Sequence, residues 1–255
     1  MQRPQALPSP CNVPKPPQAL QALVFDLDGT LIDGYEAISI SLTHAMTALG
    51  EDPWDAGTVR RHVGRGLEAL LADAVGEERA NEGVRLFREK YPEVYIDHSR
   101  LLPDVAETLG RLGSAGYRMG VATNKPAKFS REILRALGLG ELLPFCWGPE
   151  LVGRPKPDPE MVMRLLEELE TDPEDALYVG DMPVDIETAR AAGLPVWVVD
   201  TGSATRDELE AAHPDRILNG FAEIADLLAP GVVRGPDAES GDSPRSRSSF
   251  VRKNR

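Results

Sequence analysis

The sequence contains only two cysteines in 255 residues, Cys11 and Cys146, and they lie far apart. A disulfide framework and a cysteine–histidine metal site both need more cysteines, so neither is expected, and a reducing compartment suits the chain best. No apolar run approaches the roughly 20 residues that a membrane-spanning helix needs. The N-terminus also lacks the apolar segment of a signal peptide. These absences predict a soluble cytoplasmic protein without a membrane partner.

Basic residues are outnumbered, with 28 lysines and arginines against 41 aspartates and glutamates and a net charge of −13. The acidic excess lies in residues 21–230, because residues 1–20 and 231–255 are both net basic. An acidic body argues against nucleic acid as a partner of the core. It also means that an anionic substrate needs local positive charge at its site. The sequence leaves the oligomeric state open.

Both ends of the chain have the composition of disordered segments. Residues 1–20 are proline-rich without hydrophobic periodicity, and residues 230–255 are rich in glycine, serine, proline and charge. Such segments cannot bury enough apolar surface to fold. We expect a disordered extension at 1–20 and a disordered basic tail at 230–255. A tail that binds nucleic acid or is phosphorylated is the alternative to a merely solvated one.

Between the ends, short apolar runs alternate with helical patterns. The runs "ALVFDL", "YRMGVATN", "ALYVGD" and "PVWVVD" are typical of buried parallel strands, and "LPFCW" and "RILNG" are weaker candidates. This alternation with short links predicts an α/β fold, a Rossmann-like parallel sheet wrapped by helices. The predicted helices span residues 103–115, 126–137, 158–169, 183–192 and 221–229.

Residues 34–99 interrupt this alternation. They show no strand pattern, and the stretches 35–50, 66–76 and 77–95 have the character of helices. The block lies between the first strand and the helix that precedes the second strand. We therefore predict an all-helical cap at 34–99, inserted into a core domain formed by residues 21–33 and 100–229.

Polar residues stand where the predicted strands end or in the loops that follow them. In an open parallel sheet, ligands bind beyond the carboxyl ends of the strands, so these side chains are expected to share one site. In chain order they are Asp26, Asp28, Thr123, Asn124, Lys156 and Asp181.

Two aspartates only two residues apart repel each other unless a cation lies among the acids. A few oxygen ligands suit Mg²⁺, which completes its shell with water and phosphate oxygens. One carboxylate can attack phosphorus to form an aspartyl-phosphate, while the other gives a proton to the leaving oxygen and later takes one from water. Lys156 would balance the phosphoryl charge and Thr123 would hydrogen-bond the phosphoryl group.

Four motifs in this order resemble those of the haloacid dehalogenase-like (HAD) hydrolases: "FDLDGTL", "ATN", "GRPKPDP" and "VGDMPVDIETARAAG". The resemblance covers about residues 21–229. It implies that Asp26 is the nucleophile and Asp28 the acid/base, with Thr123, Asn124 and Lys156 binding the phosphate.

The same resemblance implies a set of Mg²⁺ contacts. These are the Asp26 carboxylate, the Asp28 backbone carbonyl and Asp181, with Asp185 in the outer shell. Asp185 also stands where an acid favours the first turn of a helix, and the two roles are compatible.

Two further features separate the branches of that family. Asp28 favours phosphate esters, because the dehalogenases of the family lack an aspartate there. The phosphonate-cleaving relatives use a cap lysine, and residues 34–89 contain none. The stretch "RRHVGRGLEALL" (60–71) resembles the specificity loop of phosphoglycolate phosphatase-like members. Arg65, between two glycines, would meet a substrate carboxylate there, or else lie on the exposed cap surface.

The sequence thus predicts a Mg²⁺-dependent phosphatase that hydrolyses a small phosphorylated metabolite, 2-phosphoglycolate first, through an aspartyl-phosphate. A β-phosphoglucomutase-like phosphomutase and a pyrophosphatase are alternatives on the same core. A non-catalytic binding protein is a remote alternative, because it would be expected to lack Asp26, Asp28, Lys156 or Asp181, and all four are present.

Overall fold

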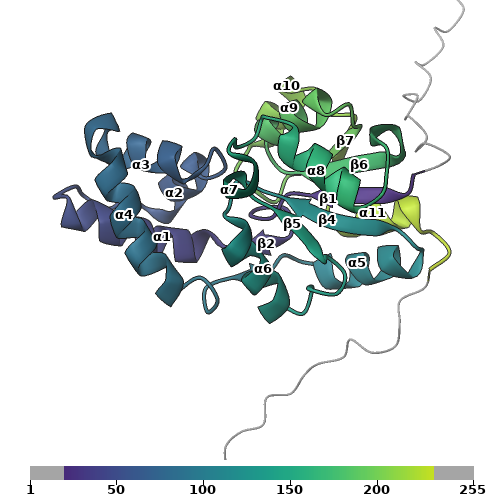
Figure 1. Ribbon diagram of the computed structural model, residues 1–255, viewed down its shortest axis with the longest axis horizontal. Helices are drawn as coiled ribbons and strands as arrows, with labels where there is room; N and C mark the ends of the chain where they lie inside the picture. Colours follow the sequence, from purple (N-terminus) through teal and green to yellow (C-terminus); the bar gives the residue numbers. More distant parts are fainter. Residues whose placement is uncertain (1–19, 233–255) are drawn as a thin grey trace, which may run out of the picture.

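The computed structural model describes residues 20–232, so the tails predicted at 1–20 and 230–255 lie almost wholly outside the described residues. Figure 1 shows a sheet with helices on both faces and a second group of helices beside it. Among the described residues, no helix combines the length and the apolar character needed to cross a bilayer.

The body of the molecule is a six-stranded parallel sheet in the order β5-β4-β1-β6-β7-β8. Each predicted strand is present, shortened to its most apolar part, and the α/β fold is confirmed. The strands are β1 (Ala22–Phe25), β4 (Arg118–Ala122), β5 (Phe145–Trp147), β6 (Ala176–Gly180), β7 (Val196–Val199) and β8 (Arg216–Leu218).

Helices cover both faces of this sheet, as Figure 1 shows. Alternate residues of β1 point to opposite faces. Leu23 and Phe25 pack with one helical layer, and Ala22 and Val24 pack with the other. A strand covered on both faces is apolar at successive positions, which explains the unbroken apolar runs of the sequence. The first layer holds α5 (Val105–Ser114), α6 (Ala127–Ala136) and α11 (Ala222–Leu228), and the second holds α8 (Glu160–Glu168), α9 (Pro183–Ala191) and α10 (Arg206–Ala211).

The second group of helices has its own apolar core, to which Leu42, Leu71 and Phe87 contribute. It contains α1 (Tyr35–Ala48), α2 (Ala56–His62), α3 (Leu67–Val75) and α4 (Ala80–Lys90). Sequence patterns indicated α1, α3 and α4 but not α2. This short helix buries a single apolar residue and so shows no periodicity, although the Asp55 carboxylate caps it by accepting a hydrogen bond from the Thr58 amide.

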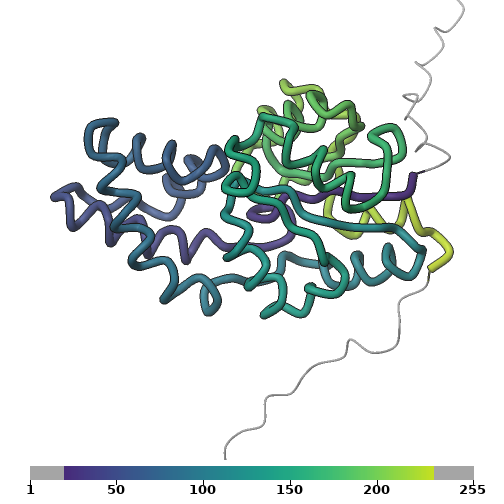
Figure 2. Tube along the Cα trace, in the orientation of Figure 1, coloured from purple at the N-terminus to yellow at the C-terminus, as the bar shows by residue number. Residues whose placement is uncertain are grey.

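The chain leaves the sheet and returns to it through a two-stranded antiparallel ladder, β2 (Ile32–Asp33) and β3 (Arg100–Leu101). The two crossings are therefore side by side, as can be followed in Figure 2. Sequence patterns did not predict this ladder, because two residues are too few to show alternation. They also missed α7 (Pro149–Val152) and α10, although Thr205 and Glu208 form a capping box that marks the start of α10.

The sheet order determines where ligands can bind. β1 lies between β4 and β6, and the chain builds β4 and β5 on one side of β1 before crossing to the other side. A crevice opens beyond the carboxyl ends of the strands where the direction of winding changes. In this fold that point is the end of β1, next to the ends of β4 and β6.

Candidate active site

Three buried aspartates gather at this point. Asp26 directly follows β1, Asp181 directly follows β6, and Asp185 lies in the first turn of α9. One carboxylate oxygen from each lies within 4.8 Å of the other two. Carboxylate oxygens at this spacing are ligands of the kind that a divalent cation such as Mg²⁺ prefers.

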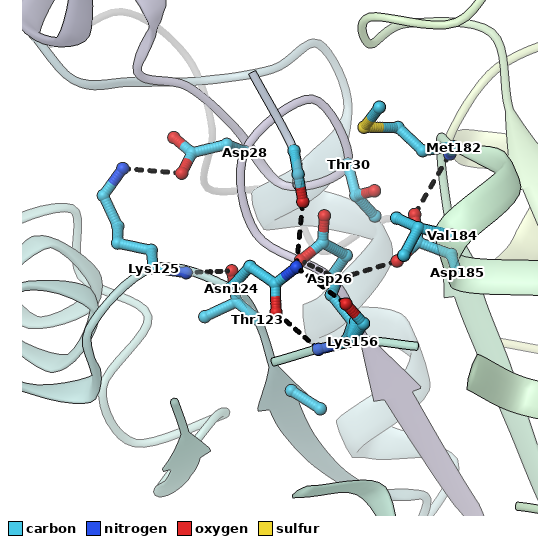
Figure 3. A network of polar contacts seen from close by, with 12 residues as sticks. Asp26, Asp28, Thr30, Thr123, Asn124, Lys125, Lys156, Met182, Val184 and Asp185 are labelled. Carbon is cyan, nitrogen blue, oxygen red and sulfur yellow. Dashed lines mark hydrogen bonds and ion pairs between the residues drawn. The ribbon is translucent and has the colours of Figure 1, made fainter. Parts of the chain in front are cut away.

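Lys156 supplies positive charge to this cluster. Its Nζ lies 2.7 Å from Asp26 Oδ1 and 2.7 Å from Asp185 Oδ1, and all three side chains are buried (Figure 3). Burial alone would lower the pKa of Lys156, but the charges of Asp185 and Asp26 outweigh burial and raise that pKa well above its usual value. Lys156 therefore remains an ammonium in this site.

One lysine does not balance three carboxylates. Burial is the main cause that raises the pKa of Asp26 to about 6, against the opposing effect of Lys156. Burial also raises the pKa of Asp181 well above its usual value, and the charges of Asp185 and Asp26 add to this effect. A divalent cation held by Asp26, Asp181 and Asp185 would stabilise their ionised forms, so the residues fit such an ion.

Hydrogen bonds fix the orientation of two of these acids. The Thr30 hydroxyl donates to Asp181 Oδ1 at 2.8 Å, and the Ser203 amide donates to Asp181 Oδ2 at 3.1 Å. Asp185 Oδ2 accepts from the amides of Asp181 (3.1 Å) and Met182 (3.0 Å), while its Oδ1 contacts Lys156. Asp185 therefore caps α9 with one oxygen and joins the charged cluster with the other.

The loop after β7 approaches Asp181 so closely that a side chain at position 202 has no space. A Cβ on Gly202 would lie 1.6 Å from Asp181 Oδ2. Neither Thr30 nor this loop was singled out from the sequence. Thr30 stands directly after "DLDG" and could have been noticed, whereas nothing local indicates where residues 201–203 lie.

Asp28 does not join the three-carboxylate cluster through its side chain. Its Oδ2 lies 2.5 Å from Lys125 Nζ; Lys125 is buried, and 11% of the Asp28 side chain is exposed. Figure 3 shows the pair on the opposite side of the site from Asp185. The other oxygen of Asp28 is buried without a hydrogen-bond partner among the described residues. Lys125 was not predicted as a site residue, although it directly follows Thr123 and Asn124 after β4.

Replacing Lys125 with methionine is expected to lower the free energy of unfolding by about 3 kcal/mol, because Asp28, with only 11% of its side chain exposed, would lose its counterion. Urea unfolding at neutral pH measures this change. The matched control is Lys128→Met, which removes an exposed lysine from the same segment and should change stability by less than about 0.5 kcal/mol. Equal effects of the two substitutions would show that the pair does not stabilise the fold.

Thr123 and Asn124 lie in the same cavity as Asp26 and Lys156. The Thr123 hydroxyl accepts a hydrogen bond from the Lys125 amide at 3.2 Å. Asn124 connects two loops: its Oδ1 accepts from the Lys156 amide at 2.7 Å, and its Nδ2 donates to the Gly64 carbonyl at 2.9 Å. Asn124 thus positions the backbone of Lys156 and contacts the helical block.

The structure does not bring Arg65 to this cavity. Gly64 and Gly66 adopt φ angles of 122° and 97°, and the loop between them presents Arg65 to solvent, where it pairs with Asp73. Gly64 itself packs so close to the core that a Cβ would lie 2.1 Å from Met182 Sδ. Of the two positions considered for Arg65, the structure shows the exposed one.

Arg60 makes a second contact between the helical block and the sheet body. Its Nε donates to the Gly202 carbonyl at 3.0 Å and its Nη2 to the Thr201 carbonyl at 2.5 Å. The amide of the next residue, Ser203, is the one that donates to Asp181. Residues 201–203 therefore contact both Arg60 of the helical block and Asp181 of the acidic cluster.

Together the two parts of the chain enclose a cavity of about 100 Å³. The sheet body contributes its polar floor, where Asp26, Asp28, Thr123 and Lys156 are exposed to the cavity. The helical block contributes most of its remaining wall. A group bound on this floor would be in contact with a buried carboxylate, a lysine and a hydroxyl.

The model of the haloacid dehalogenase-like hydrolase family matches residues 23–199. A phosphoglycolate phosphatase of Aquifex aeolicus is 31% identical over 84% of this chain and 99% of its own length. An N-acetylmuramic acid 6-phosphate phosphatase of Pseudomonas aeruginosa is 35% identical over 82% of this chain and 95% of its own length. Among solved structures, a predicted phosphoglycolate phosphatase from Haemophilus somnus matches with a TM-score of 0.77 and 29% identity, over 83% of this chain and 99% of that one.

Proposed function

The chain belongs to the haloacid dehalogenase-like hydrolase family and is a phosphatase of small phosphoesters, and on this premise we propose a Mg²⁺-dependent mechanism in which Asp26 becomes covalently phosphorylated. One observation carries the proposal: Asp26 is buried in a cluster of three acids, touches Lys156, and yet faces the cavity. A carboxylate so placed can reach a bound phosphoryl group without competition from bulk water.

Asp26 is proposed to attack phosphorus while the phosphoryl oxygens lie against Lys156 and Thr123. Lys156 stays charged and rigid because it is buried between Asp26 and Asp185. It can therefore stabilise negative charge that develops on the phosphoryl group without first reorganising.

Asp28 is the proposed acid/base because it lines the same cavity and its other oxygen makes no hydrogen bond with a described residue. It would protonate the leaving alcohol in the first step and take a proton from water in the second. The contact of its Oδ2 with Lys125 Nζ holds the carboxylate in place in the cavity.

Asp26 and Asp181 are the side chains proposed to hold Mg²⁺, with Asp185 in the outer shell and the Asp28 backbone carbonyl as a further contact from the resemblance. When bound, the ion supplies positive charge for the phosphoryl oxygens. Residues 34–99 are proposed to act as a cap on the core formed by 21–33 and 100–229. The contacts of Asn124 with Gly64 and of Arg60 with residues 201 and 202 support closure of the cap over bound substrate.

The test is release of inorganic phosphate from p-nitrophenyl phosphate and a panel of phosphorylated metabolites, with Mg²⁺ and with EDTA. Phosphate release that needs Mg²⁺ is the expected result. Full activity in EDTA would contradict the metal proposal, and no release from any ester would contradict the phosphatase mechanism.

In the metal-free protein, stability is expected to fall as the pH rises from about 4 to about 6. Burial raises the pKa of Asp26 from 3.8 to about 6, so in this interval the folded chain retains a proton that the unfolded chain has released. Mg²⁺ binds ionised carboxylates, so its stabilising effect should grow across the same interval. Thermal unfolding across this pH range, in EDTA and in Mg²⁺, measures both trends. A midpoint temperature of unfolding that does not change with Mg²⁺ at any pH would contradict a metal site at these acids.

A further inference from the structure

The cavity wall that faces the catalytic floor is strongly apolar. Its side chains come from four helices and a loop, namely Ile38 of α1, Val63, Leu67 and Leu70 of α3, Phe87 of α4 and Phe129 of α6. Most of these side chains are buried and belong to the apolar core of the helical block. The part of a substrate beyond the phosphoryl group would lie against this wall.

The cationic side chains that line the described cavity already have partners. Lys156 contacts Asp26 and Asp185, and Lys125 contacts Asp28. Arg88 also lines the cavity, but 59% of its side chain is exposed and it pairs with Glu68 at 3.1 Å.

A carboxylate on the substrate would therefore have to displace an acid of the protein or remain against apolar side chains. Loss of hydration without a counterion makes the second arrangement unfavourable.

Tyr91 adds one polar atom to this wall. The residue is buried, its ring stacks on Phe87, and its hydroxyl has no hydrogen-bond partner among the described residues. A neutral hydroxyl can hydrogen-bond an uncharged oxygen or nitrogen of a ligand, but it cannot neutralise a carboxylate. Tyr91 therefore supplies no counterion for a substrate carboxylate.

We propose that the alcohol part of the substrate is an uncharged, largely apolar group, and that phosphoglycolate is a poor substrate of this chain. This inference rests on the proposed phosphatase function, which concerns the phosphoryl group of the substrate. It adds the chemical class of the alcohol group. It differs from the 2-phosphoglycolate predicted from the sequence, and Arg65, the side chain that could have met a carboxylate there, lies outside the cavity.

Isobutyl phosphate and 2-phosphoglycolate form a matched pair of probes. They have the same heavy-atom skeleton, with an isopropyl group in one where the other has a carboxylate. With Mg²⁺ present, kcat/KM for isobutyl phosphate should exceed that for 2-phosphoglycolate by at least roughly 10-fold. From ethyl to propyl to butyl phosphate, kcat/KM should rise roughly 4-fold with each methylene until the cavity is full. Equal or higher kcat/KM for 2-phosphoglycolate would overturn the proposal.

A binding measurement keeps this test separate from the test of catalysis. Isopentylphosphonate and phosphonopropionate are the non-hydrolysable counterparts of the two esters, and calorimetry with Mg²⁺ compares their affinities. Tighter binding of isopentylphosphonate supports the inference even if no ester is turned over, a result that would contradict only the phosphatase mechanism. Tighter binding of phosphonopropionate overturns the inference and leaves the phosphatase mechanism standing.

A single substitution in the wall should reverse the preference. Leu67 is half-buried in the first turn of α3, so Leu67→Lys places an ammonium beside the cavity without changing its floor. We expect kcat/KM for isobutyl phosphate to fall and that for 2-phosphoglycolate to rise, which changes their ratio by roughly 10-fold or more. Leu67→Met is the matched control and should keep the original ratio. An unchanged ratio in a folded Leu67→Lys variant would contradict the placement of the alcohol against this wall.

Discussion

Replacing Asp26 with asparagine is expected to lower phosphate release by at least roughly 10³-fold, because an amide cannot act as the nucleophile. The fold should be retained, since asparagine has nearly the same shape and Lys156 still contacts Asp185. Phosphate release measured with p-nitrophenyl phosphate and Mg²⁺ gives the activity, and thermal unfolding confirms that the variant is folded.

Asp33→Asn is the matched control for this substitution. Asp33 belongs to the same sequence stretch but is exposed in β2, so the exchange should leave activity near that of the unmodified chain. Acid quenching during turnover should also trap a phosphorylated form of the unmodified chain and none of Asp26→Asn. Turnover by Asp26→Asn at the full rate would contradict the assignment of Asp26 as the nucleophile.

Replacing Lys156 with methionine should have the largest effect on stability. Its ammonium is the cation that contacts both Asp26 and Asp185, and all three side chains are buried. Removing one member of a buried ionic cluster leaves uncompensated charge, at a cost of about 3–5 kcal/mol in the free energy of unfolding. Urea unfolding in EDTA measures this loss, and phosphate release should be lost with it.

Two comparisons show whether charge is the cause. Lys90→Met removes a lysine from a partly exposed pair with Glu93 and should cost less than about 1 kcal/mol. The deficit of Lys156→Met should shrink as the pH falls, because a protonated Asp26 needs no counterion, and Mg²⁺ should recover part of it. A deficit that is independent of both pH and Mg²⁺ would indicate lost packing instead.

Much of the floor of the cavity could be predicted from the sequence. Asp26 and Thr123 of the floor, and the neighbouring Asp181, each follow an apolar run, and in a parallel sheet the carboxyl ends of adjacent strands share one edge. Once the runs are recognised as strands, their end residues must be close, whatever the packing of the helices. The α/β fold was accessible because strand and helix periods are local properties, and the HAD-like family was accessible through its resemblance to four short motifs.

The partners of these residues were not accessible from the sequence. Lys125 contacts Asp28 across 97 positions of the chain, and Arg60 contacts carbonyls 141 and 142 positions away. The Arg60 contacts depend on the angle at which the helical block docks on the sheet. No local pattern encodes that angle, because it results from the packing of two separate apolar cores.

The sequence by itself determined the fold class and most of the polar floor, because apolar runs mark the strands and polar residues directly follow them. Only the tertiary structure decided that Arg65 points to solvent and that side chains from four helices form an apolar wall. The physical reason is that an end residue of a strand is placed by backbone hydrogen bonding. The direction of a cap side chain is set instead by packing between parts of the chain that are distant in sequence.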